Sequence, residues 1–174
     1  MLKKSFCAVI IIMVIVLSSF PSYAYTTVLD ILKSRDIKST DEFLVSIVRP
    51  EGDETVSKKT YAISGVAKED AEDIRVHIFI ENDKGEFVEF KNTNGESSWD
   101  IGASGTFIKE VIFPAEGINS IRIAAYKKSE VENLEAGKNL QINDFKITVL
   151  PKGYWNEILK INVTKFLKSL VGAN

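Results

Sequence analysis

The chain has 174 residues, with 22 basic and 24 acidic side chains, one histidine and one cysteine. This mildly acidic balance argues against a dedicated nucleic-acid-binding protein, which would carry a basic stripe. The single cysteine, Cys7, lies in the N-terminal stretch, so the remainder excludes disulfides, cysteine-ligated zinc and thiol catalysis.

Residues 1–24 have the pattern of a secretory signal peptide. Lys3 and Lys4 precede an uncharged apolar run from Phe6 to Leu17, and Ser22-Tyr23-Ala24 places small residues at the cleavage positions. The run is shorter than the about 18 apolar residues of a membrane span, although an uncleaved anchor is the alternative. We predict cleavage after Ala24 and a bacterial protein that is secreted or otherwise extracytoplasmic, in association with the cell surface or free. The mature chain of roughly 150 residues suffices for one domain with a core.

Residues 25–41 are predicted to form an N-terminal lead-in and linker. Apolar residues cluster from Val28 to Leu32, which favours a short helix, and a polar stretch then runs to Thr40. A helix of roughly eight to ten residues is marginal unless it docks on the rest of the protein.

Residues 42–151 have apolar side chains that recur with a period of two, which is typical of β-strands. The clearest strand is Ile74 to Ile80, where Arg75, His77 and Phe79 occupy the second face. In a later strand Phe107, Val111 and Phe113 share one face, while Ile108, Glu110 and Ile112 share the other. Other strands are expected at Leu44–Val48, Tyr61–Gly65, Phe87–Phe90, Ile121–Ala125 and Phe145–Val149, with turns at Asn82–Gly85 and Glu116–Asn119. The pattern predicts a mainly β fold, an antiparallel β-sandwich of seven to eight strands.

Residues 152–174 change to a helical period. Trp155, Phe166 and Leu170 belong to an apolar stripe that recurs at three and four residues, and Gly172 ends the pattern. An isolated helix of this length is barely stable, so the predicted amphipathic helix must cover something. The alternatives are its own sandwich, a partner protein or second copy, and peripheral contact with an anionic membrane through its lysines.

The stretches Val45–Pro50, Tyr61–Ala67, Gly105–Phe107 and Glu116–Ala125 resemble a bacterial immunoglobulin-like (Ig-like) domain of exported and cell-surface proteins. The resemblance covers about residues 42–150 and implies an Ig-like β-sandwich. Such modules act as spacers, adhesins and appended domains, so the resemblance implies no particular ligand. The C-terminal helix is not part of the family pattern.

No residue pattern indicates a catalytic, cofactor or metal site. His77 is the only histidine and is expected at the surface or on the second face of its sheet. Acidic residues of the inferred loops lack the regular spacing of a calcium site; they are Glu51, Asp53, Glu54, Glu69, Asp70, Glu72, Asp73, Asp83 and Glu86. Trp99 is either a core residue or a platform for a sugar ring. The candidate binding residues are Trp99, Trp155, Phe166 and Leu170.

These observations predict an exported, non-catalytic Ig-like module for binding or assembly at the bacterial cell envelope. Its partner would be an envelope protein or a polysaccharide, and no nucleic acid. One alternative is a hydrolase or carbohydrate-binding accessory directed at the cell wall or another polysaccharide, with Trp99 and loop acids in a cleft. Another is a structural subunit that self-assembles through the C-terminal helix.

Overall fold

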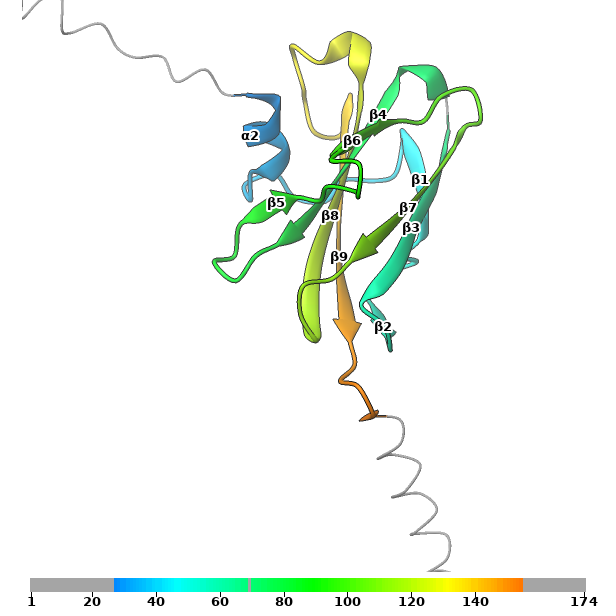
Figure 1. Ribbon diagram of the computed structural model, residues 1–174. Helices are drawn as coiled ribbons and strands as arrows, with labels where there is room; N and C mark the ends of the chain where they lie inside the picture. The colour runs from blue at the N-terminus through cyan, green and yellow to red at the C-terminus, as the bar shows by residue number, and fades with distance from the viewer. Residues whose placement is uncertain (1–26, 69, 155–174) are drawn as a thin grey trace, which may run out of the picture.

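Two β-sheets make up the body of the protein in the computed structural model, which describes residues 27–68 and 70–154 (Figure 1). The three-stranded sheet has the order β1-β3-β7, with β1 (Val45–Arg49), β3 (Thr60–Ala67) and β7 (Thr106–Ile112). The six-stranded sheet has the order β2-β9-β8-β4-β5, with β2 (Glu54–Val56), β9 (Leu140–Val149), β8 (Gly117–Lys127), β4 (Ile74–Glu81) and β5 (Phe87–Glu89). A short strand, β6 (Ser98–Asp100), also pairs with β4. Two 3-10 turns, η1 (Ala71–Asp73) and η2 (Lys128–Glu130), lie in the connections.

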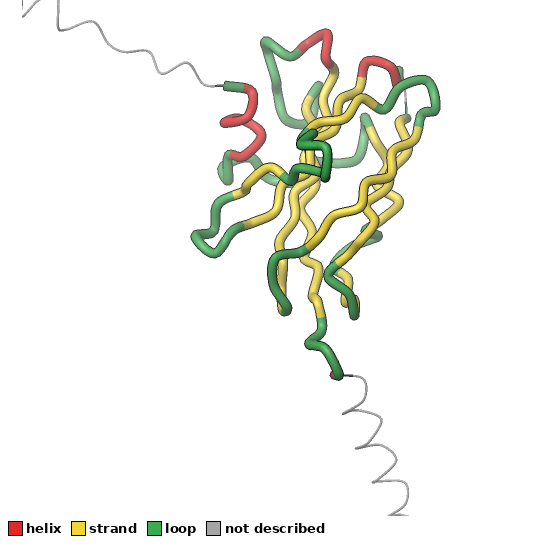
Figure 2. Tube along the Cα trace, in the orientation of Figure 1, coloured by secondary structure: helices red, strands yellow, loops and turns green. Residues whose placement is uncertain are grey.

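The sheets enclose one apolar core because alternate side chains of each strand point inward. Ile74, Val76 and Ile78 of β4 are fully buried in a cluster that also contains Tyr61 and Ile63 of β3. The same cluster includes the inward residues of β1, β7, β8 and β9. The mainly β prediction is therefore confirmed, with two sheets as its organising feature (Figure 2).

The strand count and pairing differ from the prediction. The described residues contain nine strands, because β2 and β6 are three residues each and too short to produce a recognisable alternation. The six-stranded sheet is also mixed, and not purely antiparallel as predicted, since β2 pairs with β9 in parallel. A single strand pairing of this kind depends on where two distant segments meet, which local periodicity does not report.

The turn expected at Glu116–Asn119 lies slightly earlier. Strand β8 already begins at Gly117, whose φ of +92° suits a residue without a Cβ atom. The Asn119 side chain still holds this turn, because its Nδ2 donates to the carbonyl oxygens of Ala115 and Gly117, each at 3.1 Å. Asn119 therefore stabilises the turn from within the strand that follows.

The predicted N-terminal helix is present as α2 (Val28–Lys33), and it docks on the outer face of the six-stranded sheet (Figure 1). Thr27 and Asp30 form a capping box, in which the Thr27 amide donates to Asp30 Oδ2 at 2.9 Å and the Asp30 amide to Thr27 Oγ1 at 3.2 Å. Leu32 is fully buried in a second apolar cluster with Phe79 of β4 and Ile142 of β9. The helix therefore covers a sheet face that would otherwise expose apolar side chains.

The stretch after α2, predicted as a linker, is held on the same sheet. Arg122 of β8 donates to the carbonyl oxygens of Leu32, Ser34 and Ile37, at 3.3, 2.6 and 3.1 Å. Farther along, the Thr40 amide donates to the Ile142 carbonyl at 2.8 Å. Residues 34–40 are thus part of the fold.

Two predictions lie outside the described residues: the signal peptide at residues 1–24, and the amphipathic helix at 152–174 apart from its first three residues. Within the part of the chain that the structure describes, no helix is long and apolar enough to cross a membrane.

Candidate binding surfaces

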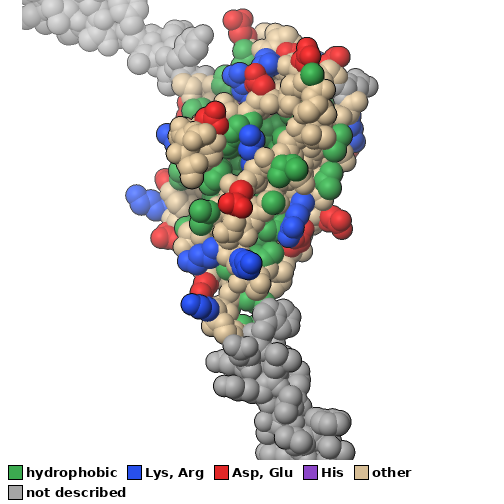
Figure 3. Space-filling model, turned by 45° about the vertical axis from the view of Figure 1, so that its right-hand side comes forward, with side chains coloured by type: hydrophobic (Ala, Val, Ile, Leu, Met, Phe, Trp, Pro, Cys, Tyr) green, Lys and Arg blue, Asp and Glu red, His purple; other side chains and the backbone are tan. Residues whose placement is uncertain are grey.

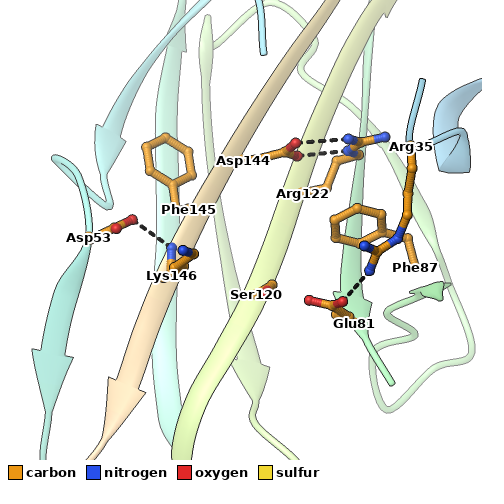
Figure 4. A pocket seen from close by; sticks show the side chains of 9 residues that line it. All are labelled: Arg35, Asp53, Glu81, Phe87, Ser120, Arg122, Asp144, Phe145 and Lys146. Carbon is orange, nitrogen blue, oxygen red and sulfur yellow. Dashed lines mark hydrogen bonds and ion pairs between the residues drawn. The ribbon is translucent and has the colours of Figure 1, made fainter. Parts of the chain in front are cut away.

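A charged cleft of about 440 Å³ opens on the outer face of the six-stranded sheet, beside the docked N-terminal stretch (Figure 4). Its lining comes from the N-terminal stretch, the residue before β2, the end of β4, the start of β5, and the middle of β8 and β9. The residues are Arg35, Asp53, Glu81, Phe87, Ser120, Arg122, Asp144, Phe145 and Lys146.

The charges of this cleft are largely engaged with one another. Arg122 forms a bidentate ion pair with Asp144, at 2.7 and 2.8 Å, and Arg35 forms an ion pair with Glu81. A hydrogen bond from Ser120 and the Arg35 guanidinium lower the pKa of Glu81, so this carboxyl group is ionised and has no proton to give as a general acid. The guanidinium carbons of Arg122 and Arg35 lie 4.4 and 5.7 Å from the centre of the Phe87 ring. The cleft is better explained as a network that anchors the N-terminal stretch than as a catalytic centre.

His77 was expected either at the surface or on the second face of its sheet. It lies on that second face and is buried there. Its Nδ1 is 3.2 Å from Glu89 Oε1, and its Nε2 is 3.4 Å from the Tyr126 hydroxyl oxygen. The ring stacks against Phe79 and Tyr126, and burial lowers its pKa. With 6 % of its surface exposed, His77 is a packed residue with little access to a substrate.

Several of the loop acids have hydrogen-bond partners of their own, in different parts of the fold. Asp73 accepts hydrogen bonds from the amide and hydroxyl of Ser129. Asp53, just before β2, accepts a hydrogen bond from the Lys146 amide of β9. Glu86 pairs with Asn82 inside the β4–β5 turn; Glu69 lies outside the described residues. Among residues 27–68 and 70–154, no group of three His, Cys, Asp or Glu side chains is arranged to hold a metal ion.

Trp99, the one candidate binding residue within the described part, is 6 % exposed and belongs to the main core. Its ring lies against Phe90, with 6.4 Å between the ring centres, and Lys109 Nζ is 5.1 Å from the ring centre. This placement favours the core interpretation over stacking on a sugar. Trp155, Phe166 and Leu170 lie outside the described residues.

The outer side of the three-stranded sheet exposes four aliphatic side chains, two of which lie on β7 with Glu110 between them. Val66 is 42 %, Val48 52 %, Ile112 61 % and Ile108 71 % exposed, and we call these four residues the outer apolar face. In the space-filling view hydrophobic side chains appear at several points of the surface (Figure 3). Exposed single hydrophobic residues are ordinary, whereas several on one sheet face are a reason to consider that face as a binding surface.

A shallow groove of about 290 Å³ adjoins this face at one side of the molecule. Its lining comes from the end of β7 and the residues just after it, from the end of β4, and from β5 and the residues that follow. The apolar residues are Ile80, Val88, Phe90, Ile112 and Pro114, and the polar ones are Glu81, Asn82, Glu89 and Lys91. The groove therefore lies between one edge of the three-stranded sheet and one edge of the six-stranded sheet. The apolar residues of this mixed lining extend the outer apolar face around the edge of β7.

Sequence reasoning did not select this surface as a candidate site. The signal was present, because Ile108 and Ile112 were assigned to the face of their strand opposite Phe107 and Val111. That alternation does not reveal whether a second layer covers the outer face. No protein-family model matches the chain, and a search of curated proteins finds no significant match.

Proposed function

We propose that this chain is an exported, non-catalytic Ig-like module that binds a partner protein at the bacterial cell envelope. The strand orders support the Ig-like assignment. In an Ig sandwich the first, second and fifth strands share one sheet, and the third, sixth and seventh share the other. If β2 and β6 are treated as additions and β5 is counted as the fourth strand, β1-β3-β7 are the first, second and fifth strands and β4, β8 and β9 are the third, sixth and seventh; the fourth strand, β5, joins the sheet of β4.

The observation that carries the binding function is the outer apolar face. Removing aliphatic surface from water is favourable by roughly 25 cal/mol per Å², so a face with four exposed aliphatic side chains gains free energy when a partner covers it. The four side chains are aliphatic, and sugar rings are usually recognised by flat aromatic ones. This composition favours a protein partner over a polysaccharide.

Fractionation of the producing cell tests this proposal. The full-length chain is compared with an Ile108→Ser/Ile112→Ser variant in culture medium, wall and membrane fractions. We expect the full-length protein in the envelope fractions and the variant released into the medium, because two of the most exposed contacts are lost.

Ile118→Ser is the matched control, since Ile118 is 70 % exposed but lies on β8 of the other sheet. This control should stay with the envelope. Cytoplasmic retention of the full-length chain would contradict export, and equal distribution of both variants would contradict binding through the outer apolar face. A chain that lacks residues 153–174 separates this route from any contribution of the predicted C-terminal helix.

A further inference from the structure

The two edges of the three-stranded sheet, β1 and β7, are treated differently by the rest of the molecule. An edge strand presents every second backbone N–H and C=O group away from its neighbour, where another strand can pair with it. Among the described residues, side chains bond to three of these groups along β1, whereas none bonds to them between Ile108 and Ile112 of β7.

At β1, side chains cap the outward-pointing backbone groups. Gln141 Oε1 accepts from the Val45 amide at 3.0 Å, and Gln141 Nε2 donates to the Val45 carbonyl oxygen at 2.8 Å. Glu42 Oε2 accepts from the Ile47 amide at 3.2 Å. A further strand is thereby prevented from pairing at this edge.

At β7, the register with β3 determines which residues face outward. In this register Gly65 lies opposite Phe107. At the two ends of the pair, the Ala67 amide donates to the Gly105 carbonyl oxygen and the Phe113 amide donates to the Lys59 carbonyl oxygen, so the hydrogen-bonded residues of both strands are the odd-numbered ones. The backbone N–H and C=O groups of odd-numbered β7 residues therefore bond to β3, whereas those of even-numbered residues point to the outer edge of the sheet. Thr106 is capped by Ser104, with its amide 3.4 Å from Ser104 Oγ.

Ile108, Glu110 and Ile112 remain, and among the described residues no side chain or loop backbone bonds to their N–H or C=O groups. Their side chains also belong to the outer side of the sheet, where all three are exposed. The free backbone edge and the outer apolar face thus meet along the same stretch of β7.

Two charges on β7 define what can pair there. Lys109 points to the inner side, with its Nζ over the Trp99 ring, and Glu110 points to the outer side. Within the described part of the chain neither side chain has an ion-pair partner. A strand placed beside β7 brings one of its own inner side chains next to Lys109 and one of its outer side chains next to Glu110.

Self-pairing of two β7 edges is disfavoured by these charges. In the antiparallel register that uses all three free residues, Glu110 lies opposite Glu110 of the second copy. A shift by one hydrogen-bonded step in one direction places Lys109 opposite Lys109, whereas the shift in the other direction places Glu110 opposite Ile112 and Lys109 opposite Phe113. Like charges directly opposite each other destabilise a strand pair, so the charges disfavour two of these three registers with a second copy.

We propose that the free edge of β7 accepts an extended strand of a partner protein, with an acidic side chain opposite Lys109 and a basic side chain opposite Glu110. Backbone hydrogen bonds to Ile108, Glu110 and Ile112 hold the strand, and aliphatic side chains of the strand contact the outer apolar face and the groove. This inference rests on the proposed binding function and defines the form and charge of the partner.

A pair of synthetic peptides tests the proposal on the folded protein. The probe is the N-acetylated, C-amidated hexapeptide Ile-Val-Lys-Glu-Ile-Val, which in antiparallel register places Lys opposite Glu110 and Glu opposite Lys109. The matched control exchanges the two charges, Ile-Val-Glu-Lys-Ile-Val, and has the same composition. We expect about tenfold tighter binding of the probe, since two opposite-charge pairs replace two like-charge pairs.

Amide chemical shifts and hydrogen exchange locate the binding. The Ile108, Glu110 and Ile112 amides should become protected on addition of the probe, whereas the Phe107 and Val111 amides, which bond to β3, should change little. Equal affinity of the two peptides, failure of both to bind, or protection elsewhere would overturn the proposal.

An Ile108→Pro variant removes one outward N–H and leaves the bonds to β3 in place, because proline is tolerated where an edge-strand N–H faces solvent. Ile108→Val keeps the N–H and serves as control. The proline variant should lose the probe and its own envelope association; if it fails to fold, the peptide pair on the unmodified protein still decides. Envelope association that persists in a folded proline variant, without peptide binding, would overturn the strand-accepting edge and leave the proposed function intact.

Discussion

Arg122 illustrates how much of this fold depends on one side chain. It is 2 % exposed and donates five hydrogen bonds. Two go to Asp144, and three go to carbonyl oxygens between Leu32 and Ile37. A buried guanidinium is tolerated only when its N–H groups are satisfied, and here all five are. Periodicity places Arg122 simply as a polar residue of β8. Its partners are backbone atoms distant in sequence, so their contribution was not predictable.

At the same scale, His77 should make stability depend on pH near neutrality. Burial lowers its folded-state pKa below the ordinary value of 6.5, so the unfolded chain binds a proton more readily. The stability that comes from neutral His77 is therefore present above pH 6.5 and is lost as pH falls toward the folded-state pKa. Because His77 is the only histidine, thermal melting between pH 7.5 and 5.5 should report this group.

The slope of melting temperature against pH is the readout, because a substitution at His77 also changes packing. His77→Gln should flatten the slope in this range. Tyr126→Phe keeps the histidine and should keep the slope, although it removes the hydroxyl 3.4 Å from Nε2. An unmodified protein whose melting temperature does not fall over this interval would contradict the expected pKa shift.

At the scale of elements, α2 is a six-residue helix that depends on docking. Leu32 is its one fully buried residue, in a cluster with Phe79, Ala124 and Leu140. Leu32→Ala should lower the free energy of unfolding by about 2–5 kcal/mol, through lost burial and the cavity left behind. Urea denaturation measures this, with exposed Ile118→Ala as a control expected to change it by less than about 0.5 kcal/mol. A near-zero effect of Leu32→Ala would mean that α2 contributes little to the fold.

At the scale of the whole molecule, the charges of β7 should keep copies of the protein apart. Glu110→Val would leave an uninterrupted aliphatic outer side from Ile108 to Ile112, and remove the like-charge opposition of the main antiparallel register. We expect this variant to self-associate more strongly than the unmodified protein in sedimentation velocity experiments. Glu132→Val, which removes an exposed glutamate near η2, is the control and should not. Equal sedimentation of all three proteins would argue that Glu110 has no such role.

Local sequence patterns were enough to place the strands whose inner faces build the core. Ile74, Val76 and Ile78 alternate strictly because a strand with a buried face needs an apolar residue at every second position, and this requirement is local. A short helix around Val28–Leu32 was predictable for the same reason, since its apolar cluster lies within a few consecutive residues, whereas its capping box was seen only in the structure.

How these elements pack and pair depends on contacts between distant segments, which no local pattern contains. The parallel pairing of β2 with β9, the docking of α2 through Arg122 and the burial of Trp99 and His77 depend on segments far apart in the chain. The contrast between the capped β1 edge and the free β7 edge has the same origin, because whether a backbone N–H is satisfied depends on which distant side chain lies beside it. Gln141 reaches β1 from β9, and no described residue does the same for Ile108, Glu110 and Ile112.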